Sequence, residues 1–101
     1  MEGKNQMLFR SALGSELRAS RIAQSRTLRD VAREARVSLG YLSEVERGQK
    51  EASSELLAAI CKALNIQLST LLGDVTSAIA KSEKATLAVV KPIDEKISDA
   101  A

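Results

Sequence analysis

Two short helical patterns lie close together in the first half of the chain, with only a tight turn between them. Thr27 is a good N-cap residue, and the apolar residues after it fall on one face of a helix over residues 28–36. Ser38 can cap a second helix over residues 39–47, and Gly48 suits the position that ends it. We therefore expect a pair of short helices joined by a turn.

The sequence on either side of this pair also has helical rather than strand periodicity. Apolar residues recur at three- and four-residue spacing over residues 8–25, Ser53 can cap a helix over residues 54–64, and a short helix is expected over residues 68–73. Proline occurs once and glycine five times, and no long alternating segment is present, so we expect an all-α fold. The inward-facing residues of the fourth helix are expected to be Leu56, Leu57, Ile60 and Leu64.

The last quarter of the chain carries a weaker apolar stripe at helical spacing. The stripe stops at Pro92, because the residue before a proline is disfavoured in helical geometry, and the end beyond it forms one more turn or frays. Such a helix packs on a second copy of the chain or folds back on its own domain. We assign residues 8–73 to one domain and residues 74–101 to dimerisation. The residues assigned to self-association are Val75, Ile79, Ser82, Thr86, Val89 and Val90.

The composition argues against several classes of protein. Histidine is absent and Cys61 is the single cysteine, so metal clusters, base–nucleophile pairs and an intrachain disulfide are not expected, and neither is an enzyme or a cofactor. Cys61 lies among inward-facing leucines, which predicts a buried structural thiol. No apolar run approaches the ~20 residues of a membrane span, and no signal peptide is evident. We therefore expect a cytoplasmic protein.

Charge is distributed unevenly along the chain. Residues 1–50 hold ten Lys and Arg against six Asp and Glu, and all eight arginines fall between Arg10 and Arg47. The rigid donor fork of arginine suits phosphate and guanine edges, although solvated helix faces also favour arginine. Charge alone leaves these two interpretations open.

Short helices joined by a tight turn can read DNA when the second helix presents small or polar residues. In such a helix-turn-helix the first helix lies across the phosphate backbone, and the start of the second enters the major groove. The segment "VSLGYLSEVERG" fits this arrangement, since Val37, Leu42 and Val45 can anchor the helix to the core. The outward residues that would face base edges are Leu39, Gly40, Ser43 and Glu44.

Residues 13–73 resemble the lambda-repressor-like, Cro/C1-type helix-turn-helix regulators, also called the xenobiotic-response-element family. "LRDVA" followed by "YLSEVERG" carries the resemblance. It implies a five-helix DNA-binding domain in which the four outward residues of the third helix read bases. It also implies an ion pair beneath the motif between Arg21 and Glu46. The residues that it assigns to phosphate contacts are Thr27, Leu28, Arg29, Tyr41, Arg47, Gln49 and Lys50.

Two residues depart from the pattern of this family. Arg36 stands where relatives commonly have glycine, so a positive φ in the turn would cost of order 1 kcal/mol, unless the turn is displaced or the second helix runs longer. Glu44 stands where a neutral residue is frequent, and a carboxylate near phosphates is unfavourable unless it finds a cytosine or an arginine.

The resemblance implies a sequence-specific regulator of transcription. We expect a homodimer on double-stranded DNA with a palindromic operator, contact with RNA polymerase, and no small-molecule ligand. The resemblance favours an activator of genes for Clp proteolysis and the stress response. The alternative is a protein-interaction module on the same fold, of the antitoxin or repressor-partner type.

Overall fold

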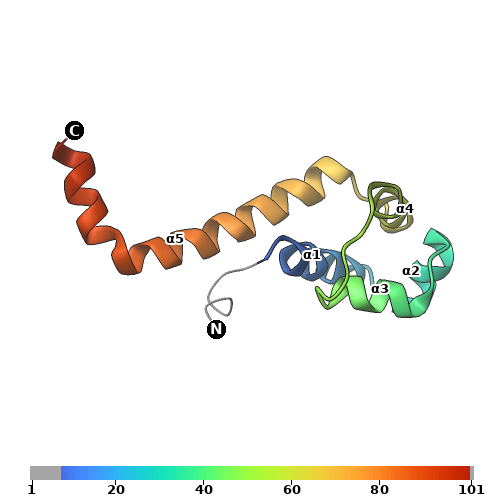
Figure 1. Cartoon of the computed structure of the whole chain (residues 1–101). Helices are drawn as coiled ribbons and strands as arrows, with labels where there is room; N and C mark the ends of the chain where they lie inside the picture. The colour runs from blue at the N-terminus through green and yellow to red at the C-terminus, as the bar shows by residue number, and fades with distance from the viewer. Residues whose placement is uncertain (1–7, 101) are drawn as a thin grey trace.

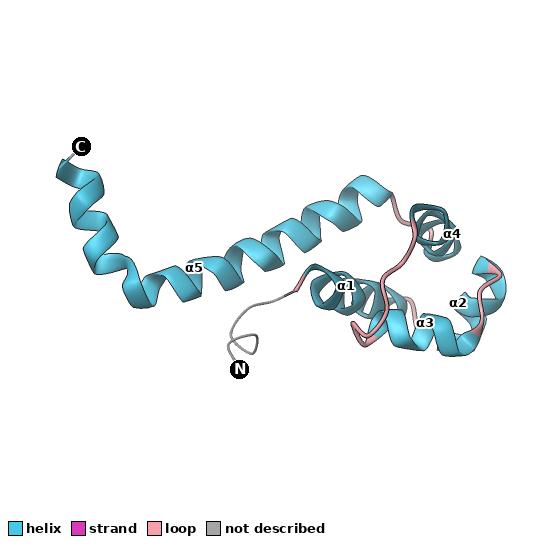
Figure 2. Ribbon diagram, in the orientation of Figure 1, coloured by secondary structure: helices cyan, strands magenta, loops and turns pink. Residues whose placement is uncertain are grey.

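The computed structural model describes the backbone of residues 8–100 and the side chains of residues 8–85. Within that range the chain forms five helices and no strand, which confirms the all-α prediction (Figures 1 and 2). No single helix there is long and apolar enough to cross a membrane, although Ser54–Leu64 and Leu68–Ala85 together pass that test as a bent pair, by length and composition only. The helices are α1 (Phe9–Ala23), α2 (Leu28–Ala35), α3 (Leu39–Glu46), α4 (Ser54–Leu64) and α5 (Leu68–Ala100).

Hydroxyl side chains cap the starts of three helices, as the sequence predicts. The Thr27 Oγ1 atom accepts a hydrogen bond from the Asp30 backbone N–H at 3.0 Å, and the Asp30 carboxylate accepts one from the Thr27 N–H at 3.4 Å. Ser38 and Ser53 accept similar bonds at the starts of α3 and α4, at 3.0 and 3.2 Å. These caps satisfy N–H groups that have no partner inside the helix, which fixes where each helix begins.

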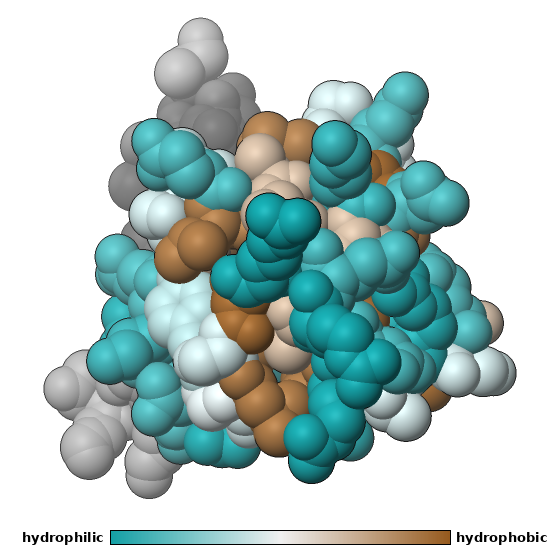
Figure 3. Space-filling model, turned by 90° about the vertical axis from the view of Figure 1, so that its right-hand side faces the viewer, coloured by the Kyte–Doolittle hydropathy of each residue, from teal (hydrophilic) through white to brown (hydrophobic). Residues whose placement is uncertain are grey.

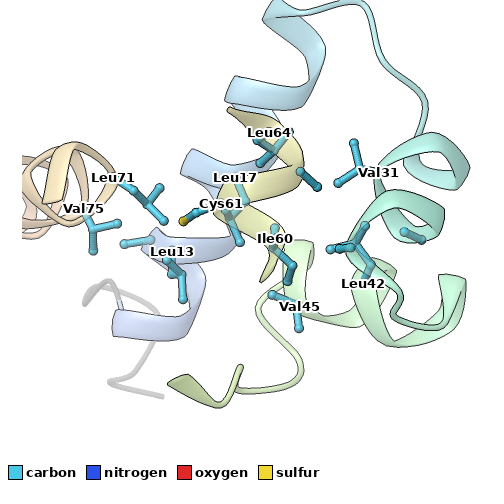
Figure 4. Close-up of a cluster of buried hydrophobic side chains, with 14 residues drawn as sticks. Leu13, Leu17, Val31, Leu42, Val45, Ile60, Cys61, Leu64, Leu71 and Val75 are labelled. Atoms are coloured by element: carbon cyan, nitrogen blue, oxygen red, sulfur yellow. The ribbon is translucent and has the colours of Figure 1, made fainter. Parts of the chain in front are cut away.

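The core is a single aliphatic cluster to which all five helices contribute (Figure 4). α1 packs on α3 and α5, and α2 packs on α3 and α4. In α4, Ile60 and Leu64 are buried as predicted, whereas Leu56 and Leu57 are only half-buried. Cys61 is buried beside them, and desolvation raises the pKa of its thiol, in agreement with the predicted structural role.

The fifth helix is much longer than the sequence predicts. It neither ends at Gly73 nor stops before Pro92, but continues to Ala100. Gly73 is exposed and costs about 1 kcal/mol in a helix, which the burial of Leu71 and Val75 on either side of it offsets. A proline inside a helix removes one hydrogen bond and bends the axis without necessarily ending it. Figure 1 shows α5 changing direction toward its C-terminal end.

The first turns of α5 belong to the core, so part of the stripe assigned to self-association folds back. Val75 is 1% exposed and packs within its own chain, which corrects its assignment to a dimer interface. Ile79 is half-buried against the same core, and Ser82 is half-buried one turn further on. The side chains of Thr86, Val89 and Val90 lie outside the described residues. Because α5 is continuous through residues 73 and 74, the proposed domain division falls inside a helix.

Arg36 adopts the left-handed conformation, which carries the steric cost that the sequence predicts for a residue other than glycine. Its φ is +61°, and its backbone N–H bonds the carbonyl of Arg33, so the turn is not displaced and α2 does not run longer. We expect Arg36→Gly to raise the free energy of unfolding by up to ~1 kcal/mol, because glycine adopts positive φ without a steric penalty. Urea denaturation would measure the change. Arg36→Ala is the matched control and should bring no such gain, since alanine keeps the strain.

Candidate nucleic-acid interface

The start of α3 is exposed, while the opposite side of this short helix is anchored in the core. Leu42 and Val45 are each 1% exposed and hold α3 in place. Leu39 is 37% exposed, Gly40 is exposed, and no atom lies within 4 Å of the position that a Cβ on Gly40 would occupy. Because α5 packs on α1, these residues stay uncovered. The first turn of α3 is therefore open to a large ligand.

Three residues predicted to contact DNA are linked by hydrogen bonds at the end of α3. The Arg47 guanidinium donates to the Ser43 hydroxyl and to the Gln49 side-chain oxygen, the latter at 3.3 Å. This places a predicted base reader beside two predicted phosphate contacts. Glu44 is half-buried, and its carboxylate has no hydrogen bond or ion pair with the described residues. Its acceptor atoms are therefore available.

The start of α2 offers backbone N–H groups and a hydroxyl. The first N–H groups of any helix lack partners within it and carry partial positive charge, which favours a bound phosphate. Here Thr27 uses its oxygen and its own N–H in the cap, but its hydroxyl hydrogen remains available. Leu28 is half-buried and can offer a phosphate only its backbone N–H, whereas Arg29 is exposed.

The loop between α3 and α4 is tied to the rest of the domain at both ends. The Tyr41 hydroxyl donates to the Glu51 carbonyl at 3.1 Å, so a phosphate contact by Tyr41 requires this bond to break. At the other end the Arg10 Nε atom donates to the Gly48 carbonyl at 2.9 Å. Gln49 and Lys50, both exposed, lie between these fixed points. Arg10 thus positions the loop.

Sequence reasoning missed Arg10 because its partner lies 38 positions away and no short-range pattern connects the two. It also missed the contacts from the α1–α2 loop to the end of α4. There Gln24 donates to the Leu64 carbonyl at 2.7 Å, and Arg26 donates to the Ala63 carbonyl. These side chains satisfy the last carbonyls of α4, which have no partner within the helix.

The predicted ion pair beneath the motif is present. The Arg21 Nε and Nη2 atoms bond the two carboxylate oxygens of Glu46 at 2.8 and 3.0 Å, and Nη1 donates to the Arg26 carbonyl at 2.9 Å. The side chain of Arg21 is only 14% exposed and that of Glu46 only 7%. The hydrogen bond to Glu46 raises the pKa of Arg21 above its ordinary value. The pair fastens the last turn of α3 to α1.

The outer face of α2 carries charges of both signs. A shallow hollow of about 520 Å³ there is lined by Arg33 and Arg36 together with Asp30 and Glu34, and Arg26 forms an ion pair with Glu34. Figure 3, which looks at the right-hand end of Figure 1 where α2 lies, shows mostly hydrophilic side chains around a narrow hydrophobic band. This face therefore lacks a purely cationic surface for a polyanion.

The motif and its surroundings match a known family. The sequence profile described as helix-turn-helix matches residues 17–71, which span α2 and α3 and the helices that hold them. The chain therefore belongs to the helix-turn-helix family of transcriptional regulators. This confirms the resemblance to Cro/C1-type regulators and the lambda-repressor-like fold.

Similarity to individual members is substantial. The chain is 56% identical over 77 residues to the transcriptional regulator ClgR of Mycobacterium tuberculosis, covering 76% of this chain and 69% of that protein. The crystal structure of the clp gene regulator ClgR from Corynebacterium glutamicum superposes with a TM-score of 0.74 at 46% identity, covering 82% of this chain and 89% of that one. The restriction-modification controller protein C.AhdI from Aeromonas hydrophila follows the same fold, with a TM-score of 0.60, 27% identity, and coverage of 61% and 94%.

Proposed function

We propose that this chain binds double-stranded DNA as a homodimer at a palindromic operator, with α3 in the major groove, and activates genes for Clp proteolysis and the stress response. The observation that carries the proposal is the exposed, capped start of α3, with Leu39 and Gly40 uncovered and Leu42 buried behind them. The major groove is about 12 Å wide and admits a helix presented in this way.

The outward residues of α3 supply chemistry suited to base edges. Leu39 can contact a thymine methyl group, Ser43 can donate or accept, and Glu44 can accept from a cytosine amino group. The exposed residues around them, Arg29, Arg47, Gln49 and Lys50, can position the protein on phosphates. In this arrangement the phosphate contacts set the register, and α3 carries the sequence preference.

A second copy of the chain is needed because one small module reads only one half-site. Two half-sites on one face of DNA are separated by about 34 Å. α5 contains 33 residues, or about 50 Å of helix, and Figure 1 shows it projecting beyond the domain that anchors its first turns. We assign self-association to the part of α5 that leaves the core, from Ser82 onward.

The similarity to ClgR supports the choice of target genes. The relatives that match most of the chain are named a transcriptional regulator and a clp gene regulator. Activation implies a contact with RNA polymerase at the promoter, and binding to chromosomal DNA places the protein in the cytoplasm. Because we propose no small-molecule ligand, we propose that the activity of the regulator is set by the amount of the protein.

A salt series separates DNA binding from a protein-interaction role on the same fold. The chain should bind random duplexes, and its affinity should fall steeply with salt. A plot of log K against log salt concentration should have a slope of about −0.9 for each phosphate neutralised. Fluorescence anisotropy with labelled duplex DNA would measure the slope. Little affinity at any salt concentration would favour the protein-interaction module and count against the proposal.

Selection of bound sites from random duplexes then tests which residues read bases. We expect Ser43→Ala and Glu44→Gln to change the preferred sequence, because their contacts go to base edges. Lys50→Ala is the matched control, and it should weaken binding to all sequences alike. If all three variants weaken binding to every sequence alike, Ser43 and Glu44 do not read bases. A selected site without two-fold symmetry would contradict the homodimer.

A further inference from the structure

An open cleft of about 860 Å³ lies between α1 and the C-terminal half of α3. On the α3 side it is lined by Ser43, Arg47 and Gln49, which belong to the predicted DNA-binding surface. On the α1 side it is lined by Arg18 and Ile22, to which sequence reasoning gave no role. The cleft therefore continues the proposed interface onto α1.

Among the described residues, neither Arg18 nor Ile22 belongs to the core or to an ion pair. Arg18 is exposed, and its guanidinium has no hydrogen bond or ion pair with the described residues, unlike Arg21 one turn later. Ile22 is 52% exposed, although most large aliphatic side chains of the described region are buried or half-buried. An unpaired cation and an exposed apolar side chain one helical turn apart form a mixed surface.

The sugar–phosphate backbone of DNA has the same mixed chemistry, because anionic phosphates alternate with largely apolar deoxyribose rings. Arginine is the side chain best suited to phosphate, since its planar fork donates two hydrogen bonds at once. Ile22 and Leu28, which both line the cleft, offer apolar contact to a sugar. Arg47 on the opposite wall adds a second positive charge.

We infer that α1 takes part in DNA binding, with Arg18 bound to a backbone phosphate and Ile22 packed on a neighbouring deoxyribose of the same strand. This inference rests on the proposed function and adds two binding residues to it. Both contacts are independent of base identity, so they strengthen binding to every sequence alike.

Arg18→Ala tests the phosphate contact. In anisotropy titrations on duplex DNA, we expect a loss of affinity of about tenfold per subunit at low salt, and a salt slope flatter by ~0.9 per subunit. The ratio of wild-type affinity to Arg18→Ala affinity should therefore fall about threefold per subunit as salt rises from about 50 to 200 mM. Arg18→Lys keeps the charge and should keep the slope. Arg33→Ala is the matched control, because it removes another exposed arginine, from the outer face of α2.

Ile22→Ala tests the apolar contact separately. We expect a loss of about fivefold per subunit with an unchanged salt slope, because apolar burial releases no counterions. A wild-type slope for Arg18→Ala, or an equal flattening for Arg33→Ala, overturns the role of Arg18. Wild-type affinity for Ile22→Ala overturns that of Ile22. The proposed function fails separately, if the wild-type chain shows no salt-dependent binding to DNA.

Discussion

Replacing Gly14 by alanine should lower the free energy of unfolding by about 3 kcal/mol and abolish DNA binding. Gly14 lies inside α1 where the end of α3 crosses it, and a Cβ there would lie 2.5 Å from the Glu46 carbonyl oxygen and closer still to that of Val45. Backbone atoms cannot move aside as a flexible side chain can, so the added methyl group forces the two helices apart. Urea denaturation and duplex titration would measure both effects.

Gly73→Ala is the matched control, because it makes the same change inside another helix. Nothing lies within 4 Å of a Cβ at Gly73, so we expect a gain of up to ~1 kcal/mol from helix propensity, with DNA binding unchanged. Equal unfolding midpoints for Gly14→Ala and the wild-type chain would show that α1 and α3 do not approach as closely as described.

Local signals in the sequence were sufficient to locate the first four helices. Each of the caps formed by Thr27, Ser38 and Ser53 involves atoms no more than three residues apart, so the information lies within one helical turn. Gly48, which has a φ of +74°, and Asn65, which has a φ of +60°, end α3 and α4 by the same local chemistry. Arg36 shows the limit of this reasoning, because it adopts the same left-handed conformation, with a φ of +61°, although its side chain disfavours it.

The length of α5 and the crossing at Gly14 depend on contacts between distant parts of the chain. Gly73 and Pro92 are both helix breakers on propensity alone. The apolar stripe between them predicts a helix there, but it does not show that this helix is continuous with the turns before Gly73 and after Pro92. The Gly14 crossing joins residues more than thirty positions apart, as does the bond from Arg10 to Gly48. Such contacts are set by how the helices pack against one another. The spacing of apolar residues along the sequence does not predict this packing.

Some residues of the candidate site could be predicted from the local motif, whereas others depend on how the helices pack. The residues assigned to base reading follow from the position of α3 in the motif, and the structure places Leu39 and Gly40 at the surface. Arg18 and Ile22 gave no signal, since an arginine and an isoleucine on an amphipathic helix are unremarkable until the cleft between α1 and α3 is known. Tyr41 shows the opposite case, in which a residue suited to phosphate already has a partner.

Removing one partner of the ion pair beneath the motif should be as damaging as the change at Gly14. We expect Glu46→Ala to lower the free energy of unfolding by about 3 kcal/mol, because it leaves the largely buried guanidinium of Arg21 without its counter-charge. Since the pair also joins α3 to α1, affinity for duplex DNA should fall at every salt concentration. Chemical denaturation and anisotropy would measure these losses.

Two comparisons separate the cost of an unpaired charge from the value of the pair itself. Arg21→Met combined with Glu46→Leu removes both charges, and it should be far less destabilising than Glu46→Ala, because no buried ion is left without a partner. Glu34→Ala breaks the pair with Arg26, in which Glu34 is 60% exposed, and it should cost less than about 1 kcal/mol. If Glu46→Ala and Glu34→Ala cost the same, Arg21 is solvated in solution, and the pair does not hold α3 against α1.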